Sequence, residues 1–515
     1  MIALAMLAAL ASQGPEPFGL VLTRGADTIA VERVAASDPT ALREEVLVPN
    51  RARLSVTAVR DADGCITSAT VAVFPWGAAP GVTPLQQVSV WFDGDSLRVY
   101  AAARGAEQRM VRPRAGARFI LPGEAVAASA LVIECGRRIQ GDSADVGAWV
   151  FPNLRPVTIR LRQRGDSTLV VTTDSSWAVS EGGVVTRLRV GRSGLVATRV
   201  PLGDIDRIAF AAPDYSAPAG APYRAVPVTV KVDESVTLAG TLTVPLGTER
   251  PVPAVVTISG SGAQDRDSHA PIAEGWRPFR ELADTLGRRG IAVLRLDDRG
   301  TGSSTGDQGA ATERTAADDA RAALAWLRSQ EGIAADRLML LGHSEGVRIA
   351  MLAAAEELDL AGLVLLSGAA DTRAATIAQA VWAAAHSPGG AAIPRDTIAA
   401  RVTRMMDSTA RTSPRAVFRW DPVPLALRIT APVMILHGAT DRQVPVDQAD
   451  SLAAVFRRAG NERVAVRVFP GRNHLLVSDP DGDFLRYDRL MSARLGEEVK
   501  GAVADWIAAV TAPQR

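Results

Sequence analysis

The sequence predicts two unlike parts, an all-β antiparallel domain followed by an α/β domain with a mostly parallel, doubly wound sheet. In the first part, over residues 18–212, apolar and polar residues alternate with a period of two. In the second part, over residues 228–512, short continuous apolar runs alternate with amphipathic stretches, which is typical of parallel strands covered by helices on both faces. The length of 515 residues also exceeds one ordinary core.

Composition narrows the class of protein. A hydrophobic content of 47% and a charged content of 22% indicate globular domains. The formal net charge of +1 gives no support for nucleic acid or an anionic surface as a partner. Beyond the N-terminus, we expect no integral membrane segment, because no stretch is long and apolar enough to span a bilayer.

The N-terminal residues 1–17 form an apolar run followed by a break rich in Ser, Gln, Gly and Pro. Small residues in Ala9-Leu10-Ala11 suit a signal peptidase, although no Lys or Arg precedes the run. We therefore expect a truncated signal peptide and export to the periplasm or the medium; the alternative is an ordinary apolar N-terminus on a cytoplasmic protein. Cys65 and Cys135, the only cysteines, form either a disulfide or two separate buried thiols.

Hairpins follow one another through residues 18–212. The alternating runs turn at Asp-Gly within 54–74, at Asp-Gly-Asp within 88–102 and at Gly-Asp within 157–173. Their succession predicts an antiparallel sheet or an open barrel. No catalytic cluster is visible here, and the role of this domain stays unknown.

Residues 213–227, rich in Pro, Ala and Gly, are the expected linker. A hairpin at 230–245 follows. After it come apolar strands in PAVVTI, IAVLRL, RLMLL, LAGLVLL, PVMIL and VAVRVF, separated by helical stretches. This order predicts the doubly wound sheet.

Two serines match the pattern G-x-S-x-G, and only one lies where a nucleophile needs to be. Ser344 separates the strand Arg337–Leu341 from a helical stretch, and Gly342 and Gly346 leave room for a tight turn. Ser304 lies in DDRGTGSSTGDQG, a run of turn-forming residues. We therefore predict Ser344 as the nucleophile.

Its partners follow by elimination in the chain order serine, acid, histidine. Of five histidines, His474 alone follows the last apolar strand. Asp441 lies just after the penultimate strand, in LHGATDRQVPV, whereas Asp447 and Asp450 fall where a helix begins. The predicted catalytic residues are Ser344, Asp441 and His474.

An oxyanion hole needs two backbone N–H groups. We expect one from Glu345, directly after the nucleophile. The other should come from the loop Ser259–Gly262, from Ser261 first and Gly262 second, because glycines let backbone approach a substrate closely. Asp265, Arg266 and Asp267 are expected to anchor this loop through salt bridges; the alternative is that they line the mouth of the site.

The motifs GSGAQDRD, LDDRGTGSS, GHSEG, PVMILHGATDRQVPV and PGRNHLL resemble, in order, bacterial serine carboxylesterases of the α/β-hydrolase superfamily. The branch is the one near dienelactone hydrolases and S9-type peptidases, some of which carry an extra N-terminal β domain. The likeness covers residues 226–512 and implies an α/β-hydrolase fold. It also implies a triad at Ser344, Asp441 and His474. Val347 departs from relatives that commonly have glycine there, which we expect to affect packing at the turn.

Residues 369–428 exceed a simple crossover helix and predict a helical cap. Trp382, Met405 and Met406 are candidates for the substrate pocket, with an ordinary core role equally open.

The expected activity is hydrolysis of small or medium carboxylic esters through an acyl-enzyme, with no metal and no organic cofactor. An S9-like serine peptidase and a thioesterase are alternatives. A non-enzymatic alternative is a lipid- or glycan-binding protein with an inert hydrolase half. The sequence leaves open whether the chain forms a homo-oligomer.

Overall fold

The chain forms two compact units in a computed structural model, residues 1–213 and residues 214–515. The structure describes residues 17–512 except 25–26, 39–40, 49–51, 76–82, 104–105, 123–142, 152–154, 165–167, 172–175, 182–183, 191–194, 209–212, 249–250, 270–272, 274, 358, 387–392, 413–419 and 491–492. Nearly all of the predicted signal peptide, and Cys135, lie outside the described residues.

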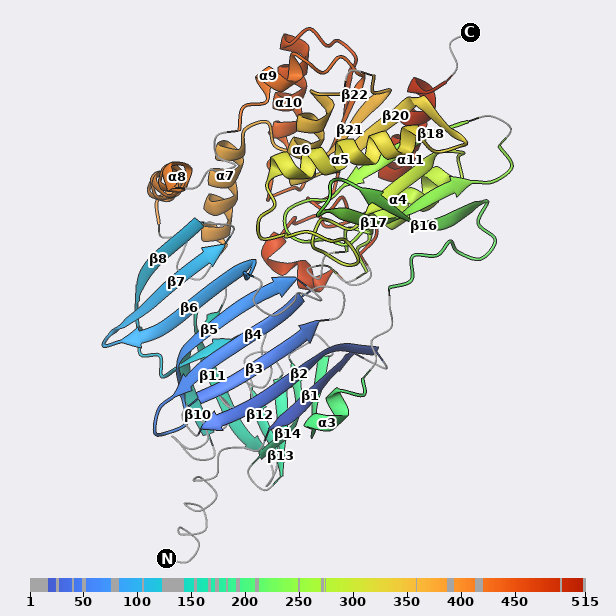
Figure 1. Ribbon diagram of the computed structural model, residues 1–515. Helices are drawn as coiled ribbons and strands as arrows, with labels where there is room; N and C mark the ends of the chain where they lie inside the picture. The colour runs from blue at the N-terminus through green and yellow to red at the C-terminus, as the bar shows by residue number, and fades with distance from the viewer. Residues whose placement is uncertain are drawn as a thin grey trace, which may run out of the picture. The chain divides into compact units, whose positions relative to one another are not determined.

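The N-terminal unit contains one 15-stranded sheet with the order β8-β7-β6-β5-β4-β3-β2-β1-β15-β14-β13-β12-β11-β10-β9. Neighbouring strands are antiparallel except β9 and β10, which are parallel. The bounds are β1 Phe18–Arg24, β2 Asp27–Asp38, β3 Ala41–Val48, β4 Ala52–Arg60, β5 Ile66–Pro75, β6 Gln86–Asp93, β7 Ser96–Ala103, β8 Ala106–Pro113, β9 Phe119–Pro122, β10 Ser143–Phe151, β11 Arg155–Arg164, β12 Thr168–Val171, β13 Ser176–Glu181, β14 Val184–Val190, β15 Leu195–Pro201 and α3 Leu202–Ile205. The predicted antiparallel β fold is confirmed, and the strands run as a meander in Figure 1.

The core of this unit follows from the alternation of side chains along each strand. Leu42, Ile66 and Leu97, from three different strands, are fully buried in one cluster. Strand β9, at one end of the order, contacts β5, so the sheet curls around this cluster. Cys65 is also fully buried there and is disulfide-bonded.

The C-terminal unit contains an eight-stranded sheet with the order β16-β17-β19-β18-β20-β21-β22-β23. Strands β16 and β17 pair antiparallel, β17 runs antiparallel to β19, and all later pairs are parallel. The strand bounds are β16 Tyr223–Lys231, β17 Thr237–Pro245, β18 Val252–Ile258, β19 Ala292–Leu296, β20 Ile333–His343, β21 Gly362–Leu366, β22 Val433–Gly438 and β23 Val464–Phe469. The helix bounds are α4 Pro278–Gly287, α5 Glu313–Arg328, α6 Glu345–Ala354, α7 Thr372–Ala385, α8 Arg395–Thr412, α9 Val423–Ala426, α10 Asp447–Arg458, η4 Phe484–Arg489 and α11 Glu497–Val510.

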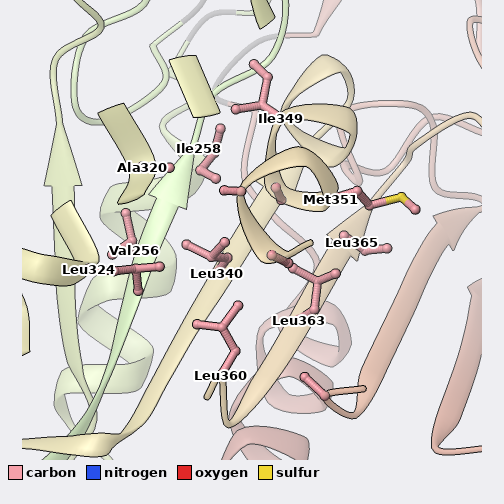
Figure 2. Packing of buried hydrophobic residues seen from close by; sticks show 14 of the residues in the cluster. Val256, Ile258, Ala320, Leu324, Leu340, Ile349, Met351, Leu360, Leu363 and Leu365 are labelled. Atoms are coloured by element: carbon pink, nitrogen blue, oxygen red, sulfur yellow. The ribbon is translucent and has the colours of Figure 1, made fainter. Parts of the chain in front are cut away.

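Helices cover both faces of this sheet because successive strand residues point to opposite sides. Leu340 packs in the cluster formed with α5, α6 and α10; Figure 2 shows it with residues of α5 and α6. Its neighbours Met339 and Leu341 pack on the opposite face, against α4 and α11. Each of these three side chains is fully buried, and burial of one such side chain stabilises the fold by about 1.5–3 kcal/mol.

The predicted linker, residues 213–227, extends too far. Strand β16 already begins at Tyr223, inside that segment, and pairs with β17 from its first residue. The linker prediction was wrong because a proline, here Pro227, argues against the interior of a strand. Strand β16 lies at the edge of the sheet, where a missing N–H is tolerated.

The predicted helical insertion at 369–428 contains α7, α8 and α9, between strands β21 and β22. Helices α7 and α8 contact each other, and an ion pair of 2.7 Å joins Arg373 to Asp407 across them. Across the part of the chain described here, no helix combines the length and apolar character that crossing a membrane requires.

Candidate active site

Ser344 lies on a strained turn between β20 and α6. Its backbone φ is 56°, in the left-handed region that a side chain rarely adopts, and its side chain is half-buried. Close packing explains the glycines around it. A Cβ on Gly342 would come within 2.9 Å of the Val347 N and even closer to the Gly346 backbone, so glycine is required there.

A chain of hydrogen bonds joins the three residues selected from the sequence. The Nε2 of His474 lies 3.0 Å from the Oγ of Ser344, and its Nδ1 lies 2.8 Å from the Oδ2 of Asp441. Asp441 follows β22 and His474 follows β23, so both come from carboxyl ends of neighbouring parallel strands. His474 and Asp441 are buried. The arrangement suits transfer of the Ser344 proton to an imidazole that a carboxylate orients.

The carboxylate of Asp441 has partners on both oxygens. Its Oδ1 accepts hydrogen bonds from the backbone N–H groups of Gln443 at 2.9 Å and Val444 at 2.8 Å. Its Oδ2 faces His474 and also lies 3.2 Å from the Nε2 of His437. Burial by itself raises the pKa of Asp441, but the two histidines outweigh burial and hold it well below its usual range.

His343, directly before the nucleophile, supports the backbone of His474. Its Nε2 donates a hydrogen bond of 3.0 Å to the His474 carbonyl oxygen, and its ring lies edge-on to Trp276 at 5.4 Å. Burial lowers the pKa of His343 to about 3, so this imidazole is neutral near pH 7.

The loop Ser259–Gly262 passes close to the nucleophile. A Cβ on Gly260 would lie 3.3 Å from the Cβ of Ser344. Within the described residues, the N–H of Ser261 has no hydrogen-bond acceptor, and Gly262 has a φ of 97°. Helix α6 begins at Glu345, so the N–H of Glu345 belongs to its first turn. These are the positions from which an oxyanion hole could be formed.

Asp298 holds both ends of the segment Ser259–Gln264, which contains this loop. Its Oδ1 accepts a hydrogen bond of 2.7 Å from the Ser259 Oγ, and its Oδ2 accepts one of 2.9 Å from the Gln264 N–H. Desolvation raises the pKa of the Asp298 carboxyl to about 7, although these hydrogen bonds oppose the rise.

The competing serine, Ser304, has a structural position. Its Oγ accepts a hydrogen bond of 2.9 Å from the Ala239 N–H and donates one of 2.8 Å to the Asp297 carbonyl. Both contacts tie the loop to the sheet. Among the residues that the structure describes, no group of three metal-ligating side chains is found.

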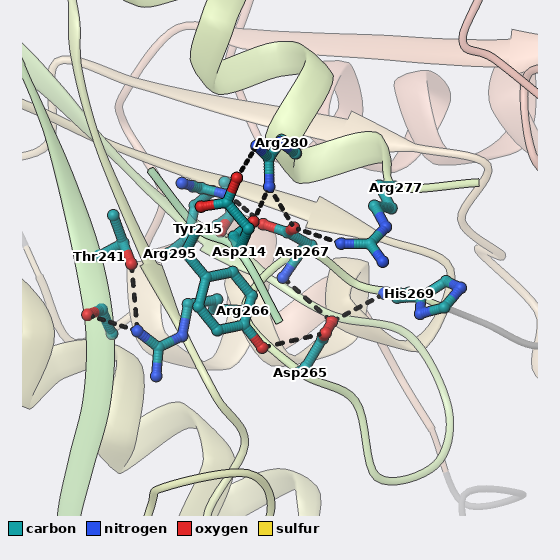
Figure 3. A network of polar contacts seen from close by, with 12 residues as sticks. Asp214, Tyr215, Thr241, Asp265, Arg266, Asp267, His269, Arg277, Arg280 and Arg295 are labelled. Atoms are coloured by element: carbon teal, nitrogen blue, oxygen red, sulfur yellow. Dashed lines mark hydrogen bonds and ion pairs between the residues drawn. The ribbon is translucent and has the colours of Figure 1, made fainter. Parts of the chain in front are cut away.

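The expected anchor behind the loop is a buried network of charges, drawn in Figure 3. Arg266 donates from Nε and Nη2 to the two carboxylate oxygens of Asp297, at 3.0 and 2.7 Å. Asp265 accepts a hydrogen bond of 3.2 Å from the Tyr215 hydroxyl, and Asp267 contacts arginines from α4 and β19. All three acidic side chains are almost fully buried, which ties the loop firmly to the sheet.

Val347, where relatives commonly have glycine, is fully buried in the first half of α6. A Cβ on Gly368 would lie 2.5 Å from the Val347 Cγ1 and 2.6 Å from its Cβ. The glycine at 368 thus provides the space that the larger residue at 347 needs.

One unit contains all three features: the mostly parallel strand order, the strained serine between β20 and α6, and the histidine after the last strand. Residues 272–422 also match the Hydrolase_4 family, described as serine aminopeptidase, S33. The C-terminal unit has the α/β-hydrolase fold. This hydrolase unit has the fold that the sequence predicted.

Two curated proteins resemble the chain in sequence. Esterase EstD of Thermotoga maritima is 27% identical over 281 residues, covering 52% of this chain and 65% of that protein. The human protein ABHD12B is 29% identical over 234 residues, covering 44% of this chain and 58% of that protein. The chain therefore spans less than two thirds of the length of either relative.

Two solved structures resemble the hydrolase unit. An esterase of Pyrococcus furiosus, Pf2001, covers 58% of this chain and 98% of its own, with a TM-score of 0.39 and 17% identity. Est1E of Butyrivibrio proteoclasticus with ferulic acid covers 55% of this chain and 99% of its own, with a TM-score of 0.37 and 20% identity.

The three predicted pocket residues have different surroundings. Trp382 on α7 is half-buried, and its ring lies 5.0 Å from that of Phe484 and stacks on His386 at 3.9 Å. Met405 is 37% exposed, whereas the neighbouring Met406 is fully buried and has no surface to offer a ligand in this structure. A role in substrate binding therefore stays a prediction for Trp382 and Met405.

Sequence reasoning missed three residues around the site, Asp298, His343 and His437. The signal for His437 was its spacing, four residues before Asp441 at the end of a strand. His343 adjoins the nucleophile, but its contact with the His474 carbonyl depends on a loop far along the chain. Asp298 could have been suspected only from its position after β19, beside the loop that it holds.

Proposed function

We propose that the hydrolase unit cleaves carboxylic esters through a covalent acyl-enzyme, with Ser344 as the nucleophile. The observation that carries this proposal is the unbroken hydrogen-bond chain from the Ser344 Oγ through His474 to Asp441. Ser344 lies at a strained turn and is half-buried, whereas His474 and Asp441 are buried.

In the first step, the Ser344 Oγ attacks the ester carbonyl carbon while the Nε2 of His474 takes its proton. His474 then returns this proton to the leaving alkoxide, so that the alcohol departs and the acyl-enzyme remains. Water attacks the acyl-enzyme in the same way and releases the acid. Asp441 stays ionised throughout because its pKa is low, and it stabilises the imidazolium.

The negative charge on the former carbonyl oxygen needs donors that are already in place. We assign this role to the N–H groups of Glu345 and Ser261, with Gly262 as the alternative to Ser261. Asp298 supports the second donor indirectly, because it holds the two ends of the Ser259–Gln264 loop.

Similarity to the Thermotoga esterase over 52% of the chain supports an ester as the substrate. A peptide is the second candidate, because the family matched by residues 272–422 is described as a serine aminopeptidase. A thioesterase remains a third. The cap helices α7 and α8, with Trp382 and Met405, are the proposed determinants of the acyl or alcohol group.

The test is hydrolysis of p-nitrophenyl acetate, butyrate and decanoate, beside an aminoacyl p-nitroanilide, by the wild type. Ester turnover without anilide cleavage supports the esterase, and the chain-length profile describes the pocket. Anilide cleavage with a larger kcat/KM than any ester assigns the enzyme to the peptidases. No turnover of either class contradicts the proposal and favours an inert hydrolase half with a binding role.

We also propose that the protein is exported. The apolar N-terminus supports this, and so does the disulfide at Cys65, since disulfides persist mainly in oxidising compartments. Expression of the full-length gene with a C-terminal tag, followed by fractionation, tests it. Recovery of the tagged protein in the cytoplasm alone contradicts export.

A further inference from the structure

The hydrolase unit contains a cavity that shares no residue with the proposed triad or with the Ser259–Gly262 loop. Its volume is about 590 Å³, within the range of sites for small organic ligands. The lining comes from the start of α4, strands β16 and β17, Arg295 of β19, and the segment from Arg494 into α11. The lining also contains three acidic residues, Glu281, Asp284 and Glu497. Lys500 pairs with both glutamates and Arg288 pairs with Asp284, so the excess of positive charge lies with the arginines. The cationic side chains are Arg277, Arg280, Arg295, Arg494 and Lys500.

Three of these arginines converge on one carboxylate, that of Asp267 (Figure 3). Arg295 forms a direct ion pair with it, Arg277 lies 3.4 Å from it, and Arg280 lies 3.8 Å from it. Asp267 is fully buried, and its single negative charge is shared among the three arginines. Asp214 lies 3.8 Å from Arg280, but its side chain is 73% exposed and contributes little. The cluster therefore carries an excess of positive charge.

The neighbouring Arg266 shows what a satisfied buried arginine looks like in this unit. Besides its two bonds to Asp297, it donates to the Gly240 carbonyl at 2.7 Å and to the Thr241 hydroxyl at 3.1 Å. Burial alone lowers the pKa of Arg266, but Asp297 raises it above its usual value.

Arg295 is equally buried but poorly compensated. Its Nη1 contacts Asp267, while its Nε has no hydrogen-bond partner within the described structure. Burial lowers its pKa, and the charge of Asp267 does not make up the difference. The hydroxyl of Thr243 and one carboxylate oxygen of Glu281, which also line the cavity, are likewise buried without a partner among the described residues. Unsatisfied buried polar groups of this kind are costly unless a ligand or water meets them.

We propose that this cavity binds a small, doubly charged oxyanion, either a phosphate group or a dicarboxylate. Two charges match the three arginines that share one carboxylate. Planar guanidinium groups hold both oxyanion types through paired hydrogen bonds. The volume exceeds that of the anionic group alone, so the ligand carries a small organic part. This site stands apart from the proposed ester hydrolysis, and its test requires no catalytic activity.

Isothermal titration calorimetry of the full-length protein tests the site, with sodium phosphate and sodium succinate as separate probes. Ionic strength is matched with sodium chloride, so that general screening is not mistaken for binding. We expect saturable binding of one anion per chain. Tighter binding of phosphate or of succinate identifies which oxyanion the site prefers.

The variant Arg277→Gln/Arg280→Gln removes two of the three converging charges. We expect it to weaken anion binding by about tenfold or more. Arg457→Gln is the matched control, because Arg457 lies exposed on α10, against the opposite face of the sheet. It should bind the anion as the wild type does.

A second variant keeps the test decisive if the double variant fails to fold. Arg494→Gln changes an exposed residue whose guanidinium donates hydrogen bonds to the carbonyls of Gly275 and Ala493. It should weaken binding by about threefold or more. The proposal is wrong if the wild type shows no saturable binding of either anion. It is also wrong if a folded cavity variant binds as tightly as Arg457→Gln.

Discussion

Gly346, two residues after the proposed nucleophile, offers a sensitive test of how the turn is built. A Cβ at this position would lie 2.6 Å from the Ser259 carbonyl oxygen and closer still to that of Ile258. Ile258 ends strand β18, and Ser259 begins the loop that passes Ser344. The added methyl group in Gly346→Ala must therefore push α6 away from that strand.

The size of the displacement follows from these contacts. Ordinary contact begins at 3.4 Å, so separation from 2.6 Å requires a shift of about 0.8 Å at the least. A misplacement of about 1 Å in a catalytic group costs roughly 10²-fold in rate. Overpacking costs about 1–3 kcal/mol, and the better helix propensity of alanine offsets about 1 kcal/mol of it.

The assay compares kcat for p-nitrophenyl butyrate and the free energy of unfolding in urea. Gly346→Ala should lose about 10²-fold in kcat and about 0–2 kcal/mol of stability. Gly501→Ala is the control, because a Cβ at this position in α11 meets nothing within 4 Å. It should keep full activity and gain about 0.5–1 kcal/mol. A Gly346→Ala enzyme with kcat within about threefold of the wild type refutes the reasoning, since the predicted displacement requires a larger loss.

Three further predictions concern the groups around the site and the disulfide. Asp441→Asn should lower kcat by about 10⁴-fold while the unfolding midpoint is largely kept, because a neutral amide cannot stabilise the His474 imidazolium; retention of a tenth of the activity contradicts this. His343 has a pKa of about 3 in the folded protein, below its value of 6.5 in the unfolded chain. As the pH drops below 6.5, the unfolded chain therefore takes up the proton first, and the free energy of unfolding falls. The loss at pH 4.5 is about 2–3 kcal/mol, and urea titrations at pH 7 and 4.5 should show a flatter pH dependence for His343→Gln. Reduction of the Cys65 disulfide should destabilise the N-terminal unit by about 2–5 kcal/mol, which calorimetry with and without reductant measures; an unchanged transition argues against it.

Local patterns explain which parts of this account could be predicted from the sequence. Ser344, Asp441 and His474 each follow a strand of a parallel sheet, and the carboxyl ends of such strands meet at one edge. Alternation and turn residues likewise predicted the three hairpins of the N-terminal unit. Gly94, with a φ of 55°, occupies one of those turns.

Contacts between distant segments explain what could not be predicted. The role of Asp298 depends on a loop more than thirty residues earlier, and the three arginines around Asp267 come from a strand and a helix. Met406 and its neighbour Met405 look alike in the sequence, but only the packing of α8 decides which is buried. The linker prediction failed because composition does not distinguish an edge strand with a proline from a loop.

Covalent labelling tests the central claim most directly, because it identifies the nucleophile itself. The full-length protein is treated with a fluorophosphonate, and the labelled peptide is identified by mass spectrometry. The account predicts one adduct per chain, on Ser344, and no adduct in Ser344→Ala or in heat-unfolded protein. Labelling of Ser304, or an absence of labelling in a folded wild type that hydrolyses esters, would contradict it.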